Sequence, residues 1–191
     1  MTGAPEPSLA DKISILSRVI GASEIPFAFG GALALAYYAE PRATVDVDVN
    51  IFAPPDSVDR VAEILGTLDI ATSAVHRRLV RRDGQVRLHW GTTPVDLFFA
   101  YDPFHFHAAA RVRRVPFGAE TILVLAPEDL LVCKVVYNRR KDWIDIEQML
   151  LLTAGTLDVD DVRGWVVALV GAGDDRKARF ERAVRDVLGD E

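Results

Sequence analysis

A strict alternation of apolar and polar residues near the start of the chain is the feature that most constrains its fold. Thr44, Asp46, Asp48 and Asn50 alternate there with Val45, Val47, Val49 and Ile51. Side chains on a strand point to opposite faces with a period of two, so the apolar residues are expected to enter a core while two carboxylates emerge on the other face. These carboxylates start about 6.6 Å apart at the backbone, close enough to hold one divalent cation or a close pair. An edge strand that shows its polar face to water is the alternative.

Composition limits the class of protein. The chain has 191 residues, of which 50% are hydrophobic and 26% charged, so it suits one globular domain with at most a small appendage. No apolar run approaches the roughly 18 residues of a membrane span, and the first twelve residues are too polar for a secretory signal. We therefore expect a cytoplasmic protein with no membrane partner. Cys133 is the only cysteine, which excludes an internal disulfide and a thiolate zinc cluster.

The distribution of predicted elements indicates an α/β (α+β) chain in two parts. Residues 1–125 mix strands and helices, and residues 126–191 are predicted to be helical. Strands are expected at 25–29, 44–52, 74–81, 85–90, 95–100, 111–115 and 121–125. Helices are expected at 10–23, 32–40, 55–66, 128–138, 142–155, 159–170 and 174–188. We expect 1–125 to be a catalytic domain and 126–191 a helical subdomain that completes the site.

Two further features of the first part point to chemistry. Asp96 stands inside the apolar run PVDLFF, where a buried charge needs an ionic partner, a proton or a metal. A core aspartate in an ion pair is the alternative. Gly30 and Gly31 lie between a predicted strand and a predicted helix, where the absence of Cβ lets a triphosphate approach the backbone. A plain tight turn also explains the two glycines.

Three charged residues outside this strand are also candidates. Lys134 interrupts the apolar run LLVCKVV, where an ammonium is costly unless it faces an anion or reaches out to solvent. Asp142, in RRKDWIDI, is either a helix cap or a site residue. Arg42 precedes Asp46 by four residues and is placed to reach either a phosphate or a surface carboxylate.

Basic residues gather in three clusters although the net charge is −6. The clusters are Arg77, Arg78, Arg81 and Arg82; Arg111, Arg113 and Arg114; and Arg139, Arg140 and Lys141. A local basic patch on an acidic protein can bind a polyanion, and a solvated face is the simpler interpretation. Arg87 and His89 share one face of a predicted strand and are candidates to line a cleft.

Together these motifs resemble the DNA-polymerase-β-like nucleotidyltransferase superfamily, and within it the AbiEii-type nucleotidyltransferase toxins that include the mycobacterial MenT group. The resemblance covers the diglycine and Arg-x-Thr-x-Asp-x-Asp of Phe27 to Phe52 and the hydrophobic-Asp-hydrophobic motif of Val95 to Leu97. It also covers a lysine followed by a basic Asp-x-x-Asp run in Glu128 to Ile146. The resemblance implies a minimal nucleotidyltransferase fold, a small mixed sheet flanked by helices and followed by a C-terminal helical subdomain.

The same resemblance implies a Mg²⁺-dependent nucleotidyltransferase. Asp46, Asp48 and Asp96 are expected to hold Mg²⁺, with two ions expected. The implied reaction is attack by an acceptor hydroxyl on the α-phosphorus of a nucleoside triphosphate, with pyrophosphate leaving.

For the nucleotide, the resemblance implies that Gly30 and Gly31 cradle the triphosphate and that Lys134 contacts phosphate. Asp142 is expected to orient Lys134 or an incoming group. The chain departs from the common glycine-serine form of the first motif, and Thr44 on the aspartate face is a candidate to supply the missing hydroxyl. Phosphorylation of Thr44 would add about −1.5 to −2 charges beside the carboxylates and repel a triphosphate.

Three functions remain open on the sequence. The leading one is a toxin that transfers nucleotides to RNA, by family resemblance the 3′ end of tRNA, and is neutralised by a cognate antitoxin. A small-molecule nucleotidyltransferase that modifies an antibiotic hydroxyl has similar motifs. A catalytically inactive domain that only binds a partner is the third.

Overall fold

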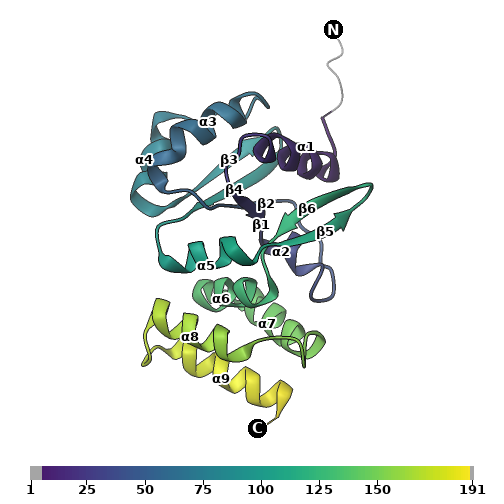
Figure 1. Cartoon of the computed structure of the whole chain (residues 1–191), viewed down its shortest axis with the longest axis vertical. Helices are drawn as coiled ribbons and strands as arrows, with labels where there is room; N and C mark the ends of the chain where they lie inside the picture. The colour runs from purple at the N-terminus through teal and green to yellow at the C-terminus, as the bar shows by residue number, and fades with distance from the viewer. Residues whose placement is uncertain (1–5, 190–191) are drawn as a thin grey trace. The chain divides into compact units, whose positions relative to one another are not determined.

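The computed structural model describes residues 6–189, and their contacts divide into two units (Figure 1). The first unit comprises the described part of Met1–Leu33 together with Ala43–Val124. The second comprises Ala34–Arg42 and the described part of Leu125–Glu191. The segment Ala34–Arg42 thus belongs with the C-terminal helices, which the sequence pattern did not indicate.

A six-stranded mixed sheet forms the centre of the first unit, in the order β3-β4-β2-β1-β6-β5. The strands are β1 (Phe27–Phe29), β2 (Val47–Ile51), β3 (Gln85–Trp90), β4 (Thr93–Phe99), β5 (Arg113–Phe117) and β6 (Glu120–Val124). β2 runs parallel to β4 and antiparallel to β1, β1 runs parallel to β6, and the two hairpins β3-β4 and β5-β6 lie at the edges. The expected mixed sheet is confirmed.

Helices precede, connect and follow these strands along the chain. They are α1 (Leu9–Gly21), α2 (Gly31–Leu35), the 3-10 turn η1 (Pro55–Ser57), α3 (Val58–Gly66), α4 (Ala74–Asp83) and α5 (Pro103–Arg111). The helix predicted at 10–23 is confirmed as α1, which begins with a capping box between Ser8 and Asp11. α2 is only five residues long and joins the two units.

The alternation at β2 is only partly confirmed. The predicted burial is confirmed for three residues, since no more than 1% of the surface is exposed in Val47, Val49 and Ile51. Val45 is 75% exposed, so the prediction that it enters the core is wrong. The reason is that β2 begins at Val47, and the residues before it are not held in the sheet.

The strand predicted at 74–81 is wrong, because this segment is helix α4. Ser73 caps the helix by accepting a hydrogen bond from the backbone of His76, whose ring accepts one in return. Gly84, with φ of 69°, ends the helix in the left-handed region. Helix α5 was not predicted, although Asp102 as N-cap and Pro103 at the first position are standard start signals.

The second unit is built from four helices of the C-terminal part. They are α6 (Pro127–Tyr137), α7 (Arg140–Leu152), α8 (Val159–Val170) and α9 (Asp175–Leu188), which confirm the predicted helical segment. α6 ends at Asn138 in the left-handed conformation, and α7 follows at once. Within this unit the Tyr38 hydroxyl donates to the Leu125 carbonyl at 2.8 Å, which ties the segment Ala34–Arg42 to the helices.

Within residues 6–189, no helix combines the length and the apolarity needed to cross a bilayer.

Candidate active site

Three neighbouring strands of the first unit place charged side chains in a row. Asp48 on β2 is the register partner of Asp96 on β4, and Asp96 is in turn the partner of Arg87 on β3. Side chains of directly paired residues lie on the same face of a sheet. The neighbouring positions on these strands, such as Val47 and Leu97, are buried on the opposite face. The register therefore brings two predicted metal ligands to one polar face.

Arg87 joins this row to Asp46. Its Nε and Nη2 donate to the two carboxylate oxygens of Asp96 at 2.7 and 2.6 Å, a bidentate pair. Its Nη2 also lies 3.6 Å from Oδ2 of Asp46. One guanidinium thus touches two of the three predicted ligands and shows that they converge.

The electrostatics of the row keep Arg87 charged. The hydrogen bonds and charge of Asp96 raise the pKa of Arg87 above its ordinary value, and the charges of Asp46 and Asp48 raise it further. The Arg87 side chain is nevertheless 54% exposed, whereas 15% of the Asp96 side chain is exposed.

Thr44 lies beside the predicted ligand set. Its hydroxyl donates to Oδ1 of Asp46 at 2.5 Å, so it restricts the orientation of that carboxylate. Asp46 sits just before β2 and is held by this local contact rather than by the sheet ladder. Thr44 therefore lies beside Asp46 through a local contact, before the start of the strand that was predicted to carry both residues.

The diglycine packs against Asp48. The backbone N–H of Gly30 donates to the Asp48 carbonyl at 2.9 Å. Gly31 has φ of 53°, and a Cβ added there would lie 1.8 Å from Oδ2 of Asp48. A side chain at Gly31 is thus excluded both by backbone conformation and by the space that the carboxylate occupies.

The donor set suits a hard divalent cation. Carboxylate oxygens are the ligands that Mg²⁺ prefers, and Asp46, Asp48 and Asp96 supply three of them around one cationic group. Like charges this close need a counter-charge, which Arg87 provides in part. The residues present therefore fit a magnesium site.

A second charged cluster lies within the second unit. The buried ammonium of Lys134 donates to Oδ2 of Asp145 at 2.6 Å, and both side chains are about 5% exposed or less. Arg42 donates to the two oxygens of Asp145 at 3.3 and 3.2 Å. Asp145 therefore compensates two cations, which explains how Lys134 is tolerated in an apolar helix.

Asp142 occupies a different place from the one expected beside Lys134. It is the third residue of α7, and its carboxylate accepts from the backbone N–H of Arg139 at 3.0 Å and from the Arg139 guanidinium at 2.7 Å. Asp142 is thus a helix cap, and Asp145 is the carboxylate that contacts Lys134. The proposed site role of Asp142 stays a prediction.

This cluster gives a stability prediction. We expect Asp145→Ala to lower the free energy of unfolding by about 3–5 kcal/mol, because the buried Lys134 charge loses its partner. We expect Lys134→Met to cost less, about 1–3 kcal/mol, because Asp145 keeps its pair with Arg42. Urea unfolding of both variants measures the difference, and an equal or larger cost for Lys134→Met contradicts the assignment of Asp145 as the shared partner.

The three basic clusters differ in how they are compensated. In the first, Arg77 and Arg81 pair with Asp59 at 2.8 and 2.5 Å. In the second, Arg113 and Arg114 are exposed on the edge strand β5. In the third, Arg140 and Lys141 are exposed at the start of α7. Arg78, Arg81 and Arg82 of the first cluster are exposed as well, and Arg81 and Arg82 lie in ion pairs with Asp59 and Asp83.

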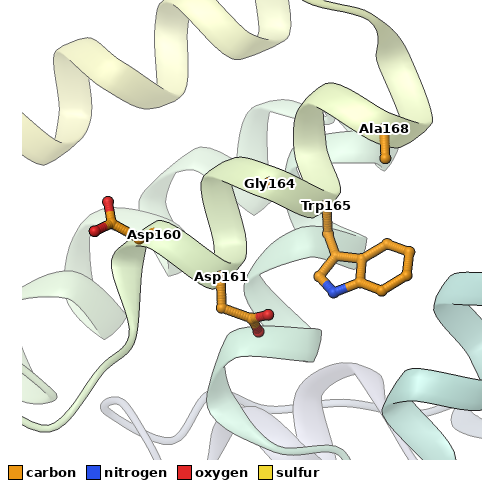
Figure 2. A pocket seen from close by; sticks show the side chains of 5 residues that line it. All are labelled: Asp160, Asp161, Gly164, Trp165 and Ala168. Carbon is orange, nitrogen blue, oxygen red and sulfur yellow. The ribbon is translucent and has the colours of Figure 1, made fainter.

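A hollow of about 390 Å³ runs along α8 in the second unit and is lined by Asp160, Asp161, Gly164, Trp165 and Ala168. Figure 2 shows Asp161 and Trp165 on one side of the helix and Asp160 pointing away from them. No residue of the predicted site lines this hollow.

Two residues of these clusters were missed as partners by sequence reasoning. Arg87 was predicted to share a strand face with His89 and to line a cleft, but its pairing with Asp96 was not predicted, because that pairing depends on the β3-β4 register. Asp145 was passed over for Asp142, because the partner of Lys134 depends on how α7 turns after Asn138. The Asp-x-x-Asp spacing showed both carboxylates on one helix without distinguishing cap from ligand.

Comparisons with known proteins identify the family of this chain. The family model described as "Nucleotidyl transferase AbiEii toxin, Type IV TA system" matches residues 14–190. A search of curated protein sequences found no match.

Solved structures share the fold at low sequence identity. The solution structure of the antibiotic-resistance factor ANT(2'')-Ia is 14% identical, with a TM-score of 0.60, over 93% of this chain and 97% of that one. The lincosamide antibiotic adenylyltransferase LnuA, solved with lincomycin bound, is 11% identical, with a TM-score of 0.51, over 78% of this chain and 100% of that one. An antigenic nucleotidyltransferase-like protein from Paracoccidioides brasiliensis is 16% identical, with a TM-score of 0.50, over 98% of this chain and 100% of that one.

These structures share a nucleotidyltransferase fold with the chain, and the family model covers nearly all of its length. The chain therefore belongs to the AbiEii nucleotidyltransferase toxin family of type IV toxin–antitoxin systems.

Proposed function

We propose that this toxin transfers a nucleoside monophosphate from a nucleoside triphosphate to an RNA acceptor, the 3′ end of tRNA, and releases pyrophosphate. The observation that carries the proposal is the convergence of Asp46 and Asp96 on Arg87, with Asp48 in register beside Asp96. A row of carboxylates on one sheet face suits in-line phosphoryl-type transfer with divalent cations.

Asp46, Asp48 and Asp96 are proposed to hold Mg²⁺, in two positions. Mg²⁺ bound there supplies charge neutralisation on the triphosphate and lowers the pKa of the acceptor hydroxyl. The carboxylates fix where the reacting groups lie, and Thr44 holds the orientation of Asp46 through its hydrogen bond. No separate side-chain base is needed.

The remaining roles are proposed from the family resemblance. Gly30 and Gly31 let the triphosphate approach the backbone, and Lys134 contacts a phosphate oxygen. An ammonium has three donors, so the bond from Lys134 to Asp145 leaves donors for a phosphate. Arg42 and Asp142 are proposed to support this end of the nucleotide.

An RNA acceptor is favoured by charge. Arg113 and Arg114 on β5 and Arg140 and Lys141 on α7 are exposed although the protein is acidic overall. Exposed arginines and lysines bind phosphate backbones and make such binding sensitive to salt. A cognate antitoxin is proposed as the protein that neutralises this activity, as the family description implies.

Antibiotic modification is the alternative acceptor chemistry. ANT(2'')-Ia is described as an antibiotic-resistance factor and LnuA as a lincosamide antibiotic adenylyltransferase, and their likeness to this chain is one of fold. The family match favours the toxin instead.

Acceptor competition tests the proposal. Purified protein is incubated with Mg²⁺ and each labelled nucleoside triphosphate in turn, with total tRNA, periodate-oxidised tRNA, an aminoglycoside or a lincosamide as acceptor. We expect label on intact tRNA and none on oxidised tRNA, which lacks a reactive 3′ end. Unlabelled tRNA with all four nucleotides, together with a labelled antibiotic, contradicts the RNA assignment.

A further inference from the structure

The Arg87 guanidinium lies among the carboxylates that are proposed to hold a metal ion. Its guanidinium occupies both oxygens of Asp96 and lies 3.6 Å from Asp46, and it carries one positive charge among three carboxylates. No family motif noted in the sequence includes Arg87. Its position follows from the strand register, in which it stands directly opposite Asp96.

The bidentate pair competes with metal coordination. A guanidinium that donates to both oxygens of Asp96 uses lone pairs of the kind that a divalent cation takes from a carboxylate. A cation of charge +2 at the same carboxylates also repels the guanidinium. A carboxylate has about four lone-pair sites, so a metal at Asp96 either shares its oxygens with Arg87 against this repulsion or takes over the sites that Arg87 holds.

The Arg87 side chain can move away from Asp96 while its strand stays in place. Its neighbours Val86 and Leu88 are 7% and 1% exposed and anchor β3 in the core, whereas 54% of the Arg87 side chain is exposed. A long arginine side chain on a fixed strand can turn into solvent without disturbing the sheet.

We infer that Arg87 is an internal counter-cation of the Asp46, Asp48 and Asp96 site, which stabilises the metal-free carboxylates and must be displaced when a divalent cation binds. Arg87 is thus a positioning residue that sets the affinity for metal. This inference rests on the metal site of the proposed function. The two can fail separately, because metal binding is measured without nucleotide turnover.

The first test is a titration of Mn²⁺, used as a paramagnetic substitute for Mg²⁺, with free Mn²⁺ followed by electron paramagnetic resonance in the absence of nucleotide. We expect Arg87→Ala to bind Mn²⁺ at least about 5-fold more tightly than wild type, because the competing cation is gone. Arg87→Lys, which keeps a charge without the fork, is expected to lie between them. Gln85→Ala, two residues away on the same strand face, is the matched control and should equal wild type.

Thermal unfolding is the second test of the competition between Arg87 and the metal ion. In EDTA, Arg87→Ala should unfold at a lower temperature than wild type, because its carboxylates lose their counter-charge. Mn²⁺ should raise its Tm by more than it raises that of wild type.

Each outcome decides the question. Equal or weaker Mn²⁺ binding by Arg87→Ala overturns the inference and makes Arg87 a support of the bound site. If neither wild type nor Arg87→Ala shows Mn²⁺ binding that Asp48→Asn removes, the metal site of the proposed function fails, and the inference fails with it.

A measurement on wild-type protein covers the case in which Arg87→Ala does not fold. The Nε–H resonance of Arg87 is assigned by its loss in Arg87→Lys and followed during addition of Mg²⁺. We expect its chemical shift to change and its exchange with water to speed up as the bond to Asp96 breaks. An unchanged resonance at saturating Mg²⁺ overturns the inference.

Discussion

We expect Asp48→Asn to lower kcat/KM for nucleotide transfer by about 10²- to 10³-fold, because one charged ligand of the reacting centre is lost. The substitution keeps the size and the backbone of β2. Transfer of labelled nucleotide to tRNA at subsaturating substrate measures the effect.

The Tm of Asp48→Asn shows whether its loss of activity comes from unfolding. In EDTA, Asp48→Asn should keep or raise the Tm, because it removes one of several like charges that repel each other. Asp56→Asn, on an aspartate whose side chain is 92% exposed, is the matched control and should keep wild-type activity. Wild-type activity in Asp48→Asn would show that nucleotide transfer does not depend on this carboxylate and would contradict its proposed role as a metal ligand.

Gly31→Ala is the second substitution with a large expected effect. The new Cβ would lie 1.8 Å from Oδ2 and 2.5 Å from Cγ of Asp48, so the carboxylate must move. The left-handed backbone adds about 1–2 kcal/mol of strain. We expect a loss of activity of about 10²-fold or more, comparable with that of Asp48→Asn.

Gly118→Ala is the matched control for strain. Gly118 has φ of 58° and no heavy atom within 4 Å of an added Cβ, so alanine there pays the conformational cost without the clash. Urea unfolding should show a loss of about 1–2 kcal/mol in Gly118→Ala, with activity retained. Activity in Gly31→Ala within a few-fold of that in Gly118→Ala contradicts the steric account.

Mn²⁺ binding by Gly31→Ala separates two explanations for its loss of activity. If alanine displaces Asp48, Mn²⁺ binding without nucleotide weakens together with activity. If the glycine serves only the approach of the triphosphate, Mn²⁺ binding stays as in wild type.

Local patterns predicted the parts of the fold that local physics controls. The alternation of Val47, Val49 and Ile51 identified β2, and the amphipathic spacing in Leu9–Gly21 identified α1. The strand predicted at 74–81 is wrong, because the capping box of Ser73 and the left-handed Gly84 favour a helix that buries only Val80. Cap residues were the better signal there than hydrophobic spacing.

Local patterns likewise predicted some residues of the candidate site but not the contacts between them. Asp48 and Asp96 could be expected on one sheet because each sits inside an apolar strand pattern. The pairing of Arg87 with Asp96 depends on long-range register, which no local pattern contains. The choice of Asp145 over Asp142 as the partner of Lys134 depends on how the turn after α6 orients α7, on which Asp145 contacts Lys134 and Asp142 contacts Arg139.

The most direct test of the central claim counts two products of one reaction. Wild type and Asp46→Ala are incubated with Mg²⁺, total tRNA and each nucleoside triphosphate, and incorporated nucleotide and released pyrophosphate are measured together. The account predicts one pyrophosphate for each nucleotide added by wild type and the loss of both products in Asp46→Ala. Undiminished formation of both products by Asp46→Ala would contradict it.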